Sequence, residues 1–101
     1  MLNINQTIHS GTVTFELEGR LNSVSAPELE AAVGNTLDGA KAVVFDFTKL
    51  TYLSSAGLRI LMTTQQAMEE TRRPDVTVRG ANAEIREVFV ITGFNNVLNI
   101  E

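Results

Sequence analysis

Cysteine is absent from this chain of 101 residues, and histidine occurs once, at His9. The lack of cysteine excludes disulfides, thiol catalysis and Cys-based zinc sites. A single imidazole cannot complete a His-rich metal site, so we expect no bound metal and no cofactor. Basic residues are also few, with eight Lys and Arg against twelve Asp and Glu and a net charge of −4. Such an acidic chain lacks the electrostatic footprint of a nucleic-acid-binding protein and gains nothing near an anionic membrane surface.

Long apolar runs and linkers are missing as well. No stretch approaches the roughly 18 consecutive apolar residues of a membrane span, and the N-terminus lacks the charged-then-apolar pattern of a signal peptide. No Pro/Gly/Ser-rich segment divides the chain. Hydrophobic residues make up 44% of the sequence, which is enough to build a globular core. We therefore expect one cytoplasmic domain over residues 1–101, with no insertion into the membrane.

Hydrophobic periodicity predicts the β-strands. Turn residues at 9–11 join the first two strands as a hairpin. The nearly continuous apolar run over residues 42–47 is typical of a central strand that is buried on both faces. The predicted strands are residues 2–8, 12–19, 42–47, 76–78 and 97–100.

Three helices separate the later strands. Pro27 with nearby acids is a typical helix opening, and Gly39 is a typical stop. The second helix is predicted from about Ser55 to Thr71, and Asn82 is the candidate N-cap of the third. One side of the second helix carries Leu58, Leu61, Met62, Gln65 and Met68. The order β-β-α-β-α-β-α-β predicts an α/β fold with a mixed, mostly parallel sheet, covered by helices on one face or on both.

The strongest candidate site is the junction between the central strand and the second helix. In open α/β sheets, ligands and partners gather at the carboxyl ends of strands, beside helix N-termini. Ser54 and Ser55 lie at this point, and a serine there either caps the helix or carries a phosphate beside its free N–H groups. Gly57 costs about 0.5–1 kcal/mol relative to Ala in a first helical turn, so either a close backbone approach or a partner would explain it.

Two more polar residues are candidates for this site. Asp46, at the end of the predicted central strand, and Asn22, after the second strand, either approach the serines or act as a strand-terminating acid and a turn former. No Ser/His/Asp set can be assembled, because His9 lies in the opening hairpin turn. No glycine-rich nucleotide motif or Walker lysine is present. Binding is therefore favoured over catalysis, and we expect no catalytic residue.

The junction resembles the signature of STAS domains, and it is more closely similar to bacterial anti-sigma factor antagonists. The resemblance rests first on Asp46-Phe47-Thr48 followed by Tyr52-Leu53-Ser54-Ser55-Ala56-Gly57-Leu58. It extends over nearly the whole chain, through Glu18-Gly19-Arg20-Leu21-Asn22-Ser23, Ala26-Pro27-Glu28-Leu29 and Phe89-Val90-Ile91-Thr92-Gly93-Phe94.

This resemblance implies a binding switch controlled by phosphorylation. In such a switch Ser55 is phosphorylated by an anti-sigma factor that is also a serine kinase with the histidine-kinase-like ATPase fold, and a phosphoserine phosphatase reverses the reaction. The unphosphorylated protein binds the kinase and releases a sigma factor. The partner-binding residues that the resemblance implies are Asn22, Asp46, Ser54, Ser55, Ala56, Gly57 and Leu58.

Two other hypotheses remain open. Asn22 and Ser54 stand where well-known members of the family carry Asp, which favours a STAS scaffold subunit of a transport or signalling complex without serine phosphorylation. A hydrolase using Ser55 would need an activating base that the sequence does not supply. Family members usually carry a further helix after the last strand, whereas this sequence ends at Glu101. We therefore expect the final strand to be uncovered and to pair with a partner or a second copy, as a homodimer.

Overall fold

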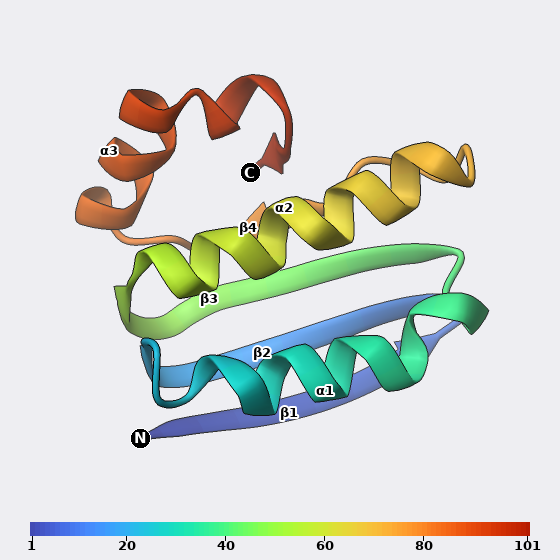
Figure 1. The fold of residues 1–101 in the computed structure, drawn as a ribbon, viewed down its shortest axis with the longest axis horizontal. Coiled ribbons are helices and arrows are strands. Elements are labelled where there is room, and N and C mark those ends of the chain that lie inside the picture. Colours follow the sequence, from blue (N-terminus) through green and yellow to red (C-terminus); the bar gives the residue numbers. More distant parts are fainter.

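A computed structural model describes residues 1–101 as a five-stranded sheet with three α-helices (Figure 1). The element order confirms the prediction of an α/β fold. The strands are Leu2–His9 (β1), Thr12–Leu21 (β2), Ala42–Leu53 (β3), Thr77–Arg79 (β4) and Asn99–Ile100 (β5). The α-helices are Ala26–Thr36 (α1), Ser55–Glu70 (α2) and Ala83–Thr92 (α3), and the short 3-10 helices are Leu37–Gly39 (η1) and Phe94–Asn96 (η2).

The sheet is mixed and mostly parallel, as expected. Its strand order is β1-β2-β3-β4-β5, in which β1 is antiparallel to β2 and the other neighbours are parallel. The predicted hairpin is present, since β1 and β2 are antiparallel neighbours joined by Ser10 and Gly11. These two turn residues both have positive φ angles, of 51° and 86°. Positive φ at both central residues is what a two-residue type I′ turn requires.

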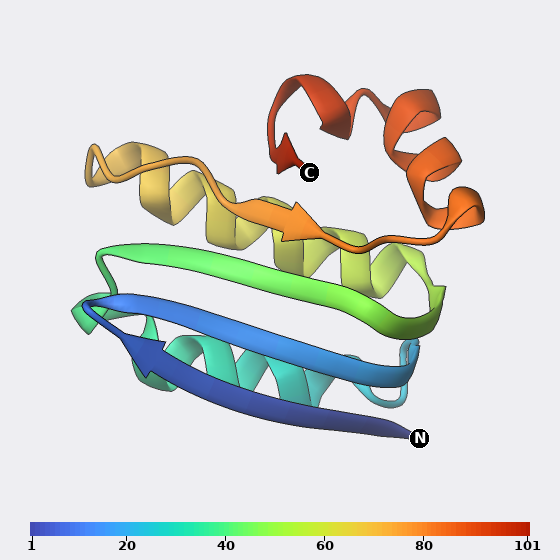
Figure 2. The ribbon, with the colours of Figure 1, turned by 180° about the vertical axis from the view of Figure 1, so that it is seen from behind.

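All three helices pack on one side of the sheet. Helices α1 and α2 lie across one face (Figure 1), and no helix covers the opposite face of β1, β2 and β3 (Figure 2). The ring of Phe89 in α3 stacks on Phe47 of β3 at 6.4 Å, so α3 joins the same buried side. The prediction that the central strand is buried on both faces is wrong. Along β3, buried Phe45 and Phe47 alternate with half-buried Val44 and Asp46, because the second face has no covering layer.

The core is one cluster of 23 buried hydrophobic residues. Aromatic stacking connects its strands, with the Phe15 and Phe45 rings 5.4 Å apart. Gln65 is fully buried in α2 and has its polar groups satisfied. Its Nε2 donates to Oδ1 of Asp75 at 2.8 Å, and its Oε1 accepts from the N–H of Val76 at 2.7 Å. Gln65 thereby joins α2 to the segment that leads into β4. None of the helices combines the length and the apolar character that crossing a membrane would require.

Candidate functional site

Two strand-to-helix junctions meet where the carboxyl ends of strands β2 and β3 lie side by side. Strands β2 and β3 run parallel, and Leu21 and Leu53 are paired where the two strands end. Beyond this pair, the N–H of Ser54 donates to the carbonyl of Leu21 at 2.9 Å. Asn22 and Ser54 therefore follow the carboxyl ends of neighbouring parallel strands, as the sequence predicted.

Asp46 does not lie near these two junctions, and the expectation that it ends the central strand is wrong. Strand β3 continues to Leu53, and eight further residues at about 3.3 Å each place Ser54 roughly 25 Å from Asp46. The pattern concealed this continuation because the register with β2 shifts between Glu16 and Glu18. A bulge of this kind interrupts the alternation of apolar and polar residues on which the strand prediction rests.

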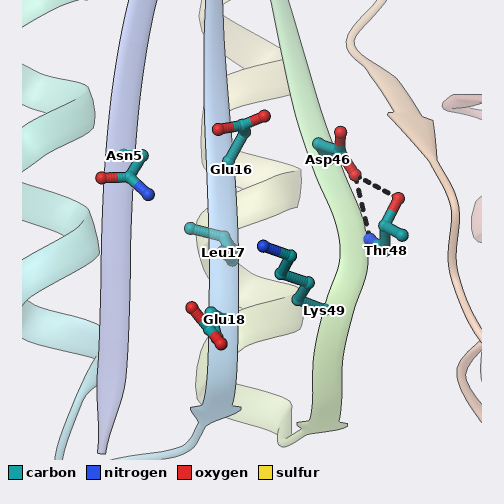
Figure 3. A pocket seen from close by; sticks show the side chains of 7 residues that line it. All are labelled: Asn5, Glu16, Leu17, Glu18, Asp46, Thr48 and Lys49. Carbon is teal, nitrogen blue, oxygen red and sulfur yellow. Dashed lines mark hydrogen bonds between the residues drawn. The ribbon is translucent and has the colours of Figure 1, made fainter.

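The carboxylate of Asp46 faces the open side of the sheet. Its Oδ1 accepts from the N–H of Thr48 at 2.9 Å and from the Thr48 hydroxyl at 2.6 Å, and Arg79 Nε lies 3.8 Å from its Oδ2. Partial burial raises the pKa of Asp46, but these bonds together with Arg79 and Lys49 outweigh it and hold the pKa below its ordinary value. Figure 3 shows this region, a shallow hollow of about 230 Å³ lined by Asn5, Glu16, Leu17, Glu18, Asp46, Thr48 and Lys49.

The two serines begin α2 without capping it through their side chains. Ser54 is the N-cap residue, and its carbonyl accepts the first helical bond, from the N–H of Leu58 at 3.0 Å. The hydroxyl of Ser54 makes no capping bond, and its Oγ is buried with no hydrogen-bond partner. Ser55 is exposed at the first helical position. Its hydroxyl therefore faces solvent beside the N–H groups that a helix leaves unpaired at its N-terminus.

Gly57 is explained by a close approach of the helix to the sheet. It is buried, and a Cβ at this position would lie 2.6 Å from Cδ1 of Leu53 and 2.8 Å from Cδ2 of Leu21. Only a residue without a side chain lets α2 start so near the two strand ends. Ala56 and Leu58 are half-buried against the core, so Ser55 is the one exposed residue in the run Ser55-Ala56-Gly57-Leu58.

Asn22 acts as a turn former. Its Oδ1 accepts from the N–H groups of Val24 and Ser25, both at 3.0 Å, and from the Ser25 hydroxyl at 3.2 Å. The carbonyl of Arg20, at 2.8 Å, is the nearest of the acceptors that share the single proton of this hydroxyl. The side chain of Asn22 therefore holds the turn between β2 and α1, next to the serines.

A groove between α1 and α2 opens beside this junction, and the sequence did not reveal it. It consists of two hollows, of about 270 Å³ and 150 Å³, that share Glu30 and Ile60. The small residues that line it, Ala26 and Gly34 on α1 and Ala56 and Ala67 on α2, are visible in the sequence. Only the packing of the two helices against each other shows that these residues form one groove. The first hollow is lined by Ser23, Ala26, Pro27, Glu30, Ala56, Arg59 and Ile60. The second is lined by Glu30, Val33, Gly34, Leu37, Ile60, Thr63, Thr64 and Ala67.

Comparison with known proteins connects this geometry to a family. The family model described as "Mlab, STAS domain" matches residues 4–99. BtrV of Bordetella bronchiseptica, a candidate anti-sigma factor antagonist, is 33% identical over 85 residues, which are 83% of this chain and 72% of BtrV.

Solved structures share the fold. The crystal structure of an anti-sigma factor antagonist from Mycobacterium paratuberculosis superposes with a TM-score of 0.86 at 25% identity, over 99% of this chain and 85% of that one. The phosphorylated form of SpoIIAA from Bacillus matches with a TM-score of 0.78 over 100% of this chain and 91% of that one, and its 14% identity shows the fold alone. The family match spans both junctions and the groove, and this chain belongs to the STAS domain family.

Proposed function

We propose that this chain is an anti-sigma factor antagonist that binds an anti-sigma factor and so releases a sigma factor, with Ser55 as its control point. The observation that carries the proposal is the exposed Ser55 at the start of α2, beside the groove between α1 and α2. The names of BtrV and of the Mycobacterium paratuberculosis protein support the general role. The proposal implies a cytoplasmic protein, because sigma factors act there.

The switch is electrostatic. A neutral serine directly before Ala56, which lines the groove, can be covered by a partner at little cost, and Pro27, Ala56 and Ile60 provide apolar surface in the groove. Phosphorylation would add about −1.5 to −2 charge at this point. Covering that charge requires its desolvation, so binding is lost. The helix N-terminus stabilises the phosphate by roughly 0.3–1 kcal/mol while it is exposed.

The kinase and the phosphatase complete the proposed cycle. The binding partner is an anti-sigma factor of the histidine-kinase-like ATPase fold, which phosphorylates Ser55, and a phosphoserine phosphatase restores the binding form. SpoIIAA, a protein of the same fold, has been solved in a phosphorylated form, which supports phosphorylation within this fold. We expect little backbone change, because Gly57 packs against Leu21 and Leu53 on the side away from the phosphate.

A second function is favoured by the length of the groove. Its further hollow extends along α2 to Ala67, away from Ser55, and offers a surface that a partner can bind whatever the state of the serine. Asn22 and Ser54 bring no negative charge to the junction, and the Asn22 side chain is engaged in its own turn. The second candidate is therefore a STAS scaffold subunit of a transport or signalling complex.

Capture of partners from a lysate of the native cells distinguishes the two functions. The baits are the wild-type chain, Ser55→Ala, Ser55→Asp and the matched control Ser10→Asp, which places the same change in the exposed turn at the other end of β2. We expect wild type, Ser55→Ala and Ser10→Asp to retain a histidine-kinase-like ATPase that Ser55→Asp loses. Retention of the same partners by all four baits would exclude the switch and support the scaffold.

Phosphorylation itself is tested by incubating the captured ATPase with the wild-type chain and ATP, followed by mass spectrometry. We expect one added phosphate on Ser55, and none on the Ser55→Ala chain. A phosphate on Ser54 instead would move the control point by one residue. We also propose that the chain has no catalytic activity, and an activated ester should produce no burst of product with Ser55 present.

A further inference from the structure

Strand β1 is the long free edge of the sheet. It pairs with β2 alone, in a continuous register from Leu2 opposite Gly19 to His9 opposite Thr12. No other segment lies beyond it (Figure 2). The opposite edge, at which the sequence suggested pairing, is β5, which is only the two residues Asn99–Ile100. The eight residues of β1 therefore offer the more extensive edge for adding a strand.

The backbone groups of β1 that face outward can be identified. The carbonyl of Met1 accepts from the N–H of Arg20 at 3.2 Å, which makes these two residues a hydrogen-bonded pair with β2. Hydrogen-bonded and non-hydrogen-bonded pairs alternate along antiparallel strands. Odd-numbered residues of β1 therefore direct their backbone groups toward β2. The outward N–H and carbonyl groups belong to Leu2, Ile4, Gln6 and Ile8.

This edge lacks the features that usually prevent strand addition. Protected edges carry lysine, proline, inward-pointing charges or a bulge, or they are very short. Strand β1 reads LNINQTIH, with no proline and no Lys, Arg, Asp or Glu, and its register with β2 has no shift. Ile8 is 63% exposed on this strand. The edge is long, neutral and partly apolar.

The strand is complementary to itself. A two-fold axis perpendicular to the sheet joins two antiparallel copies of β1 while both helix layers stay on the same side. If the axis passes through Gln6, Ile4 lies opposite Ile8 of the second copy, and all the outward groups of Ile4, Gln6 and Ile8 become paired. The exposed Ile8 is then covered by an isoleucine. The chain has a net charge of −4, but no charged side chain on β1 repels its copy.

We propose that this protein forms a two-fold dimer in which β1 pairs antiparallel with β1 of a second copy, centred on Gln6. The two sheets become one continuous sheet of ten strands. Because the axis reverses the strand direction, the Ser55 sites of the two copies point to opposite ends of the dimer, and both remain open to partners. The dimer does not depend on the proposed switch.

Sedimentation velocity over a range of concentrations tests the dimer. We expect wild type to show a dimer that Gln6→Pro and Ile8→Lys each weaken at least tenfold. Gln6→Pro removes an outward N–H that the monomer does not use, as edge strands permit. The matched control is Ile91→Lys on α3, which changes an isoleucine that is 76% exposed away from the edge. A wild type that stays monomeric, or equal weakening by Ile91→Lys, would overturn the proposal.

The register is tested by cross-linking, because the chain has no cysteine of its own. In the proposed pairing the two Gln6 Cα atoms lie about 5.5 Å apart, within the range that a disulfide spans. Gln6→Cys should therefore form a covalent dimer under mild oxidation, and Thr7→Cys, which lies opposite Asn5 of the second copy, should not. Cross-linking of both variants to the same extent contradicts this register. Capture of an extended segment of another protein in place of a second copy contradicts the dimer.

Discussion

The junction from β2 to α1 and the junction from β3 to α2 lie side by side, but they use their polar groups differently. In the first, Asn22 and Ser25 bond to each other and to the surrounding backbone. In the second, the Ser54 hydroxyl has no partner and Ser55 is exposed. The first junction is a closed structural turn. The second buries the Ser54 hydroxyl but leaves Ser55 accessible, which is what a binding or modification site requires.

The glycines of α1 and α2 also differ in how tightly they are packed. Gly57 at the start of α2 lies tightly against Leu21 and Leu53, whereas Gly34 in α1 is exposed, and a Cβ added there would meet no atom within 4 Å. The second junction therefore combines Gly57, which packs tightly against the strand ends, with Ser55, which is exposed to solvent. Such a site can bind a partner or carry a phosphate without a change of fold.

Gly57→Ala should have the largest effect on stability. The added methyl group would contact Leu21 and Leu53 at less than 3 Å, so we expect a loss of about 1–3 kcal/mol in the free energy of unfolding. Gly34→Ala is the matched control and should stabilise the chain by about 0.5–1 kcal/mol, because alanine favours the helix and meets open space. Urea unfolding measures both. Stabilisation by both substitutions would remove the contrast in packing.

Asn22→Ala tests the closed polar turn. It removes the acceptor of two backbone hydrogen bonds, from the N–H groups of Val24 and Ser25, and we expect a loss of about 1–2 kcal/mol in urea unfolding. Asn22→Asp retains an acceptor oxygen and should lose much less. Equal losses for the two variants would show that the amide group, and not the accepting oxygen, maintains the turn.

Asp46→Asn tests whether the open face of the sheet contributes to stability alone, while the two junctions bind the partner. The pKa of Asp46 is lowered in the folded protein, so its stabilisation is present above the ordinary pKa of about 3.9 and is lost as the pH falls through the lowered value. The difference between wild type and Asp46→Asn should be under about 1 kcal/mol at neutral pH and should shrink below about pH 4. Unfolding measured from pH 7 to pH 3 checks this. Partner capture should be unchanged, and its loss would return Asp46 to the binding site.

Ser54→Ala should have the smallest effect. Removal of a buried hydroxyl without a partner should change the free energy of unfolding by less than about 0.5 kcal/mol. Ser25→Ala, the corresponding change in the neighbouring turn, should cost about 1 kcal/mol because its hydroxyl is bonded. A loss for Ser54→Ala as large as that for Ser25→Ala would show that the two junctions are capped alike.

Local patterns were sufficient for much of the fold. The order of elements follows from runs of apolar residues and from turn and cap residues that act over a few positions. Asn82 is such a case, because its Oδ1 accepts from the N–H of Ile85 at 2.9 Å as the N-cap of α3, and Gly93 ends that helix with a φ of 80°. The serine junction could be predicted for the same reason, since strand, serines and helix are contiguous.

Other features needed contacts between distant segments. The end of β3 was misplaced because pairing with β2 across a bulge extends the strand to Leu53, and Asp46 was misassigned with it. Gln65 occupies a position on the apolar side of α2 that is tolerated only because Asp75 and Val76 satisfy its amide.

The sequence by itself determined the order of the elements, the fold class and the position of the serines, because periodicity and capping are local properties of the chain. Only the tertiary structure decided that one face of the sheet stays open, that Gly57 must be small, that a groove runs beside Ser55 and that β1 is a free edge. Each of these depends on which segments meet in space, and a meeting of distant segments leaves no signal within a short window of sequence.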